Sequence, residues 1–154
     1  MQCVDTLAIR MSIMTKTYEE MLRYSSLQDR IEYLLLHGYV GEDTFGSRRY
    51  LNQSFYQSYD WKKTRRRVIL RDNGCNLALP EYPINRGEGL VIHHINPITI
   101  DDIINGNPEV YSLNNLVCVS RRVHDAIHYG DASVVSYYDE IERRPNDTCP
   151  WKEA

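Results

Sequence analysis

Four histidines in two pairs are the residues of this sequence best suited to chemistry. His93 and His94 are adjacent in GLVIHHINP, and His124 and His128 lie four residues apart in SRRVHDAIHYG. Two imidazoles four residues apart on a helix project from one face and lie close enough to share a metal ion. Adjacent strand residues point to opposite faces, so His93 and His94 cannot both be simple ligands of one ion. We expect the two to have different roles.

Short apolar runs and turn residues predict the elements that position these histidines. Leu90–Ile92 and Leu116–Val119 are each apolar enough for a short buried strand. Ser120 is suited to cap a helix over Arg121–Tyr129, and Gly130 to end it in a left-handed conformation. The predicted order of elements around the histidines is therefore strand, strand, helix.

This constellation resembles the HNH (ββα-metal) nuclease motif once Asn115, nine residues before His124, is included. The spacing is similar to that of the colicin-type DNases, and the chain from Tyr18 through Asp131 resembles phage-borne HNH endonucleases. The resemblance implies an α+β protein in which an N-terminal helical segment is followed by a ββα-metal (His-Me finger) core. Because the two CxxC pairs of many HNH nucleases are missing, no second metal site is expected.

The resemblance also implies a role for each residue of the motif. One divalent ion would be ligated by His93, His124 and His128. His94 would be the general base that deprotonates the attacking water. Asn115 would hold the loop after the first strand and so orient His94, with Asn114 as the alternative. Imidazole ligands favour zinc, nickel, manganese or cobalt, and magnesium is not excluded, so the identity of the ion stays open.

A basic segment precedes the histidines along the chain. Residues 61–71 carry a formal charge of +6, which leaves −9 on the rest of a chain whose total is −3. The cations are Lys62, Lys63, Arg65, Arg66, Arg67 and Arg71. On a helix Lys62, Arg65 and Arg66 would share one face, while Trp61, Val68 and Ile69 turn inward. We expect phosphate contacts that hold duplex DNA over the metal site, with Arg121 and Arg122 as further candidates; a merely solvated helix face is the alternative.

The remaining sequence predicts the organisation of the chain. We divide it into an N-terminal helical and linker segment (1–60), a basic segment with the nuclease core (61–131) and a C-terminal tail (132–154). Thr17 and Glu20 form a potential capping box, and Ser26 can cap a second helix that ends at Gly38. Residues 41–60 lack a clear period and predict a loop or linker that contains a short helical turn, and the tail predicts a short helix over 134–143.

Composition excludes several classes of protein. The chain has 154 residues and no apolar run near the roughly 20 residues of a membrane helix, so no membrane partner is expected. The N-terminal stretch lacks the apolar region of a secretory signal, which predicts a cytoplasmic protein, and Met14 is an alternative initiator. The four cysteines contain no CxxC pair and predict reduced thiols: Cys3, Cys75, Cys118 and Cys149.

The function expected from these features is that of a metal-dependent HNH endonuclease, which hydrolyses phosphodiester bonds of double-stranded DNA by cutting or nicking. Its resemblance to phage proteins implies action in the cytoplasm of a host cell, either in homing or beside a phage terminase during DNA packaging. The alternative is a noncatalytic, metal-stabilised DNA-binding module. The sequence leaves the oligomeric state open.

Overall fold

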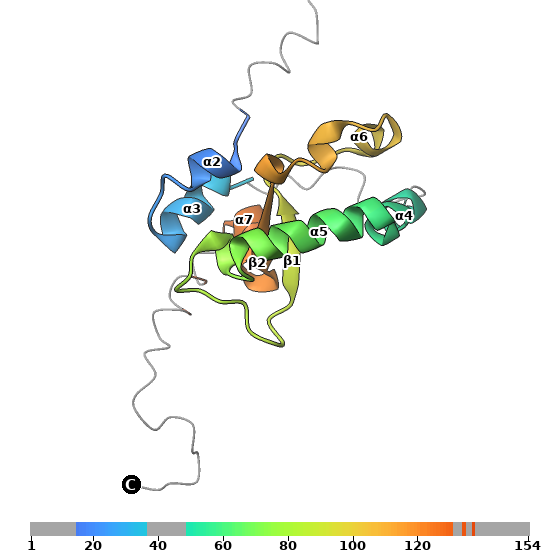
Figure 1. Cartoon of the computed structure of the whole chain (residues 1–154). Helices are drawn as coiled ribbons and strands as arrows, with labels where there is room; N and C mark the ends of the chain where they lie inside the picture. The colour runs from blue at the N-terminus through green and yellow to red at the C-terminus, as the bar shows by residue number, and fades with distance from the viewer. Residues whose placement is uncertain (1–14, 37–48, 131–133, 135–136, 138–154) are drawn as a thin grey trace, which may run out of the picture.

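The computed structural model describes residues 15–36, 49–130, 134 and 137, which form a mixed helix and strand (α+β) fold around a two-stranded sheet (Figure 1). The α-helices are α2 (Tyr18–Met21), α3 (Leu27–Leu34), α4 (Arg49–Gln57), α5 (Tyr59–Asp72), α6 (Ile100–Ile104) and α7 (Arg121–Tyr129). The strands are β1 (Leu90–His94) and β2 (Leu116–Ser120). Three 3₁₀ turns complete the fold: η1 (Asn76–Ala78), η2 (Pro108–Val110) and η3 (Leu113–Asn115).

The antiparallel pair β1–β2 is the centre of the fold. Its register places His93 opposite Val117 and His94 opposite Leu116. Helix α7 follows β2 without a loop, because the Ser120 side chain accepts a hydrogen bond from the Val123 amide and caps the helix. The predicted bounds of α7 are confirmed, and β1 extends two residues beyond the predicted strand to include both histidines.

Helices α5 and α7 cover opposite faces of this hairpin. Val117 and Val119 share one apolar cluster with residues of α7. Leu116 and Cys118 point the other way and share a second cluster with Trp61 and other residues of α5. This alternation follows from the two-residue period of a strand, and Figure 1 shows α5 crossing in front of the strands. The sheet therefore separates the basic helix from α7.

Helix α3 packs against α7, α2 packs against α3 and η3, and residues of all three helices share one apolar cluster. The predicted cap of α2 is present, since the Thr17 hydroxyl accepts from the Glu20 amide at 3.2 Å. The return bond of the capping box is relayed by Tyr33. Its hydroxyl accepts from the Thr17 amide at 3.0 Å and donates to the Glu20 carboxylate at 2.6 Å.

Helix α3 begins at its predicted cap but ends earlier than Gly38, which lies outside the described residues. Ser26 accepts from the Asp29 amide, as a capping residue should. At Leu35 the backbone leaves the helical conformation, and the Leu36 amide donates to the Ile127 carbonyl of α7. The helix stops here because the chain bonds to α7 instead of continuing its own ladder.

The prediction of a loop over residues 41–60 is wrong for residues 49–57, which form α4. The helix is stabilised by tertiary contacts that the local sequence does not predict. Phe55 is buried and packs on Trp61 and Tyr111, with ring centroids 5.1 and 5.6 Å away. Ser58 then caps α5, which begins at Tyr59. Residues 41–48 lie outside the described residues.

Several further predictions can be compared with the described residues only in part. Cys75 and Cys118 are free thiols, as predicted, whereas Cys3 and Cys149 lie outside the described residues. The same holds for Met14 and for most of the predicted helix in the tail. Within the described part of the chain, no helix combines the length and the apolar character needed to cross a membrane.

Candidate metal centre and neighbouring base

The structure brings three of the four paired histidines together: His93 from β1 and His124 and His128 from α7. One ring nitrogen of each lies within 4.8 Å of the others. The His93 ring meets the other two edge-on, with centroids 5.4 and 5.3 Å away. His124 and His128 are successive turns of one helix face, and their Nε2 atoms are 3.2 Å apart. We call these residues the histidine triad.

Two buried nitrogens of the triad have no hydrogen-bond partner among the described residues. They are His93 Nε2 and His128 Nδ1. Leaving a buried polar atom unpaired costs about 1–3 kcal/mol, so such atoms are rare unless a ligand satisfies them. A metal ion in the triad would satisfy His93 Nε2. It would not satisfy His128 Nδ1 if His128 binds the ion through Nε2, the nitrogen that faces His124. A zinc ion with Zn–N bonds of about 2.0–2.1 Å places two tetrahedral ligand atoms roughly 3.3–3.4 Å apart, close to the 3.2 Å observed. The triad therefore fits a divalent metal ion.

Burial favours the form of these imidazoles that can bind a metal. The pKa of His93 is lowered well below its usual value, first by burial and then by His124 and His128. The pKa of His128 is also lowered, again mainly by burial and then by His124. Neutral imidazole carries the lone pair that a metal needs, so the lowered pKa values favour the ligating form of His93 and His128.

His94 lies on the opposite face of β1, as the strand alternation predicts. Its ring stacks on Trp61 with centroids 5.3 Å apart and planes 20° apart. His94 Nε2 lies 3.0 Å from the Val110 carbonyl oxygen, which can only accept; Nε2 therefore carries the proton and Nδ1 the lone pair. Burial lowers the pKa of His94 to about 4, and the Val110 carbonyl opposes this shift only in part. The ring is neutral near neutral pH.

Asn115, which we predict to orient His94, hydrogen-bonds to the chain after His94 and to the turn that contains Val110. Its Oδ1 accepts from the backbone and side-chain nitrogens of Asn96, both at 2.8 Å, and its carbonyl accepts from the Ile95 amide. Its Nδ2 donates to the Glu109 carbonyl at 3.3 Å. Asn115 thereby ties the chain after His94 to the turn that supplies the Val110 carbonyl. Asn114, the alternative, instead accepts from the Glu19 amide of α2.

Sequence reasoning missed two contributors to this region. Asn96 links Asn115 to the N-terminal stretch, since its side chain donates to the Lys16 carbonyl and accepts from the Lys16 amide. The second contributor is the backbone carbonyl of Val110, which bonds to His94. Every residue has such a carbonyl, so the residue type could not predict this contact. The position of Asn96 two residues after His94 was the available signal for it.

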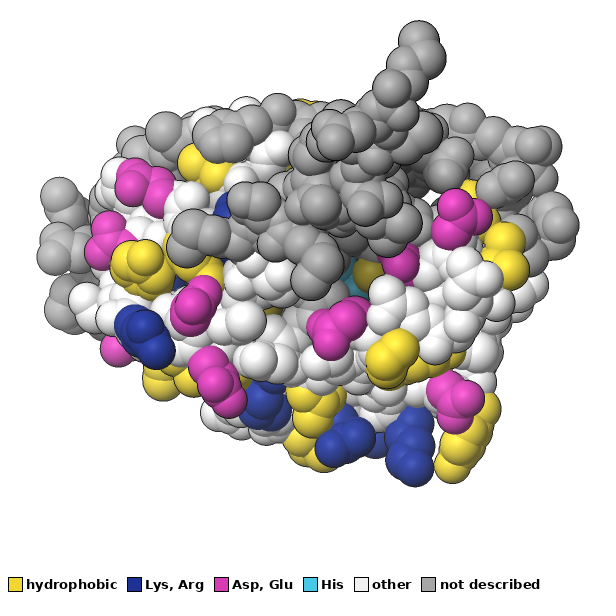
Figure 2. Space-filling model, turned by 90° about the horizontal axis from the view of Figure 1, so that it is seen from above, with side chains coloured by type: hydrophobic (Ala, Val, Ile, Leu, Met, Phe, Trp, Pro, Cys, Tyr) yellow, Lys and Arg dark blue, Asp and Glu magenta, His cyan; other side chains and the backbone are white. Residues whose placement is uncertain are grey.

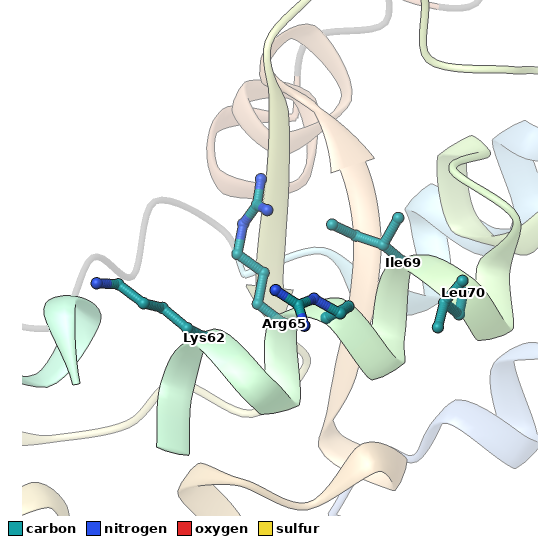
Figure 3. A pocket seen from close by; sticks show the side chains of 5 residues that line it. Lys62, Arg65, Ile69 and Leu70 are labelled. Atoms are coloured by element: carbon teal, nitrogen blue, oxygen red, sulfur yellow. The ribbon is translucent and has the colours of Figure 1, made fainter. Parts of the chain in front are cut away.

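Five of the six predicted cations of α5 are exposed and make no hydrogen bond or ion pair with other described residues. They are Lys62, Lys63, Arg65, Arg66 and Arg67. Lys62, Arg65 and Arg66 line a shallow pocket together with Ile69 and Leu70 (Figure 3). In a view from above, Lys and Arg side chains gather along one edge of the molecule, and little histidine surface is visible (Figure 2). Because α5 and α7 cover opposite faces, these cations lie on the side of His94 and not of the triad.

Arg71, the sixth cation, differs from its prediction as a DNA contact. It donates to both Asp72 oxygens and to the carbonyls of Leu113 and Leu116. Its guanidinium lies 3.4 Å from the centre of the Tyr18 ring. These contacts occupy the donors that a phosphate would need, so Arg71 holds the fold together instead.

The two cations at the start of α7 lie on the triad side of the hairpin. Arg121 is exposed, and its amide donates to the carbonyls of Glu88 and Gly89 before β1. Arg122 is also exposed, and its guanidinium lies 3.9 Å from the centre of the Tyr137 ring. Both guanidinium groups remain accessible to an anionic ligand.

Comparison of the chain with protein-family models, with curated proteins and with solved structures gave no match.

Proposed function

We propose that the protein is a metal-dependent DNA endonuclease of the HNH type, which cuts or nicks double-stranded DNA. The observation that carries the proposal is the pairing of two unlike histidines on β1. His93 has an unpartnered buried Nε2 within a cluster of three imidazoles, and His94 is fixed by a backbone carbonyl with its Nδ1 free to accept a proton. In this proposal β1, β2 and α7 form a ββα-metal core.

Each residue of the site then has a defined task. The triad would hold one divalent ion: zinc, nickel, manganese or magnesium. Such an ion, when bound, supplies electrostatic stabilisation of charge on a phosphate group and its leaving oxygen. His94 Nδ1 would accept the proton of the attacking water, and Nε2–H would keep the ring oriented by donating to Val110. Asn115 would hold that carbonyl and the chain after His94 in place.

DNA would be held by cations on both sides of the hairpin. The exposed lysines and arginines of α5 lie on the His94 side, and Arg121 and Arg122 begin α7 on the triad side. Phosphate contacts of this kind position a duplex without reading its sequence. The resemblance to phage proteins supports a role in the host cytoplasm, in homing or with a terminase partner.

A plasmid-nicking assay with added manganese, magnesium, nickel or zinc tests the proposal. Wild-type protein should convert supercoiled plasmid to nicked or linear DNA. His94→Ala should keep metal binding and lose about 100-fold or more in cleavage rate, because a general base contributes about 10²–10⁴-fold. His124→Ala should lose both metal binding and cleavage.

The noncatalytic alternative makes a different set of predictions for the same assay. If wild-type protein binds metal and DNA yet leaves the plasmid intact in every metal, the protein is a DNA-binding module and the nuclease proposal fails. Equal loss of metal binding in His94→Ala and His124→Ala would contradict the separate roles of the two histidines.

A further inference from the structure

The orientation of the His94 ring requires two constraints, and the predicted site supplies only one. Donation from Nε2 to the Val110 carbonyl fixes the direction in which one ring nitrogen points. Because Nε2 lies close to the Cβ–Cγ axis, this one hydrogen bond restrains rotation of the ring about Cβ–Cγ only weakly, and a second contact is needed to fix the plane of the imidazole and the position of Nδ1. The Trp61 ring stacks on the His94 ring, with 5.3 Å between the ring centroids and 20° between the ring planes.

We infer that Trp61 is a positioning residue, which holds the plane of the His94 imidazole so that Nδ1 faces the attacking water. This inference rests on the proposed function. The geometry of the neighbouring rings distinguishes it from ordinary core packing. Trp61 meets Phe55 at 42° and Tyr56 at 80°, and the near-parallel contact is the one with His94. Parallel stacking restricts rotation out of the plane, which a tilted contact does not.

Trp61 is itself held from two directions. Its amide donates to the Ser58 hydroxyl, which in turn donates to the Phe55 carbonyl. Phe55 packs on both Trp61 and Tyr111, with centroids 5.1 and 5.6 Å away. Because Tyr111 follows Val110 directly, the carbonyl and the stacked indole that fix His94 belong to one connected assembly.

The position of Trp61 also links His94, the proposed general base, to the exposed lysines and arginines of α5. Trp61 is on the buried face of α5, with 4% of its surface exposed, and its neighbour Lys62 begins the exposed basic face. The helix that would contact DNA with its outer side therefore holds the base with its inner side. A shift of α5 would move both together.

The test compares Trp61→Leu, which removes the flat surface, with Trp61→Phe, which retains an aromatic ring. In steady-state plasmid cleavage, Trp61→Leu should lower kcat at least about tenfold, since a misplaced catalytic group loses much of its rate advantage. KM and metal affinity should stay within about twofold of wild type, because the triad and the cations are untouched. Trp61→Phe should recover most of kcat.

Val68→Ala is the matched control, because Val68 lies on the same buried face of α5. It should reduce thermal stability while leaving kcat unchanged. If Trp61→Leu keeps the wild-type kcat, or if Val68→Ala loses kcat as much as Trp61→Leu at an equal loss of stability, the inference is overturned.

An NMR measurement tests the stacking independently of activity. In wild-type protein the ring protons of His94 should be shifted upfield by the indole, and Trp61→Phe should reduce this shift. Unshifted His94 protons would overturn the inference even if the Leu variant failed to fold. If no metal supports cleavage but the shift is present, the nuclease proposal fails and the positioning of His94 by Trp61 stands.

Discussion

The hairpin contacts two buried polar centres of opposite character, one at Asp72 and one at the histidine triad. The Asp72 carboxylate accepts four hydrogen bonds: from the Tyr18 hydroxyl, two nitrogens of Arg71 and the Cys118 amide. The triad leaves His93 Nε2 and His128 Nδ1 unpartnered among the described residues. A buried polar group with all of its hydrogen bonds made stabilises the fold. A buried polar group without a hydrogen-bond partner instead indicates a binding site for a ligand.

The largest expected effect is at Asp72. Asp72→Ala would remove the acceptor of the Cys118 amide and two of the four hydrogen bonds of the Arg71 guanidinium. Breaking a buried ion pair on one side costs about 3–5 kcal/mol. We expect a loss near the lower figure, because the Arg71 side chain is 24% exposed. Urea unfolding in the absence of metal measures it. Asp60→Asn, an exposed acid of the same helix, should change stability far less; an equal loss would remove the special status of Asp72.

The next effect concerns metal binding by the triad. Zinc at about 100 times its dissociation constant should raise the free energy of unfolding of wild-type protein by roughly 2.7 kcal/mol. EDTA should reverse the gain, and His124→Ala should abolish it. Thermal unfolding with and without zinc is the measurement. The gain should persist in any folded Asp72 variant, because the two centres are separate; its disappearance there would show that they are coupled.

In the absence of metal, a substitution of His93 should change the free energy of unfolding only slightly. His93→Leu removes a buried nitrogen that has no partner, so metal-free stability should stay within about 1 kcal/mol of wild type or rise. Stabilisation by zinc should be lost. Val117→Ala, at the paired position of β2, should be clearly destabilising. A loss at His93 as large as that at Asp72 would erase the distinction between the two centres.

The smallest effect is on the reactivity of Cys118. Burial and the nearby Asp72 carboxylate raise the pKa of its thiol to about 12, so almost no thiolate exists at pH 8. In a variant with Cys3, Cys75 and Cys149 changed to Ser, a thiol reagent should modify Cys118 only as fast as the protein unfolds. Rapid modification of the native protein would mean that the Asp72 centre opens locally.

Local features of the sequence were sufficient for α7 and for the grouping of its histidines. Ser120 and Gly130 mark the two ends of the helix by side-chain capping and by a left-handed backbone, both of which are decided within a few residues. The period of the helix then places His124 beside His128, and the period of the strand separates His93 from His94. These rules involve only near neighbours in the chain.

Features that depend on distant residues could not be predicted in the same way. Arg71 is one of six cations by composition, but it is bonded to carbonyls more than 40 residues away. Helix α4 depends on the contact of Phe55 with Trp61 and Tyr111, and the orientation of His94 depends on a backbone carbonyl. In each case the partner is chosen by the tertiary fold, and residue type alone does not identify it.

The bonds that fasten the N-terminal helices have a consequence for the protein as it is being synthesised. Asn96 bonds Lys16 across 80 residues, and the Leu36 amide needs the Ile127 carbonyl. At about 5–20 residues per second, the ribosome takes roughly 5–20 s to add the chain from Leu36 to Ile127. Throughout that interval α3 lacks its contacts with α7, although α2 and the η1 turn can already pack against it. The interface between α3 and α7 therefore forms only after almost the whole described part of the chain has been synthesised.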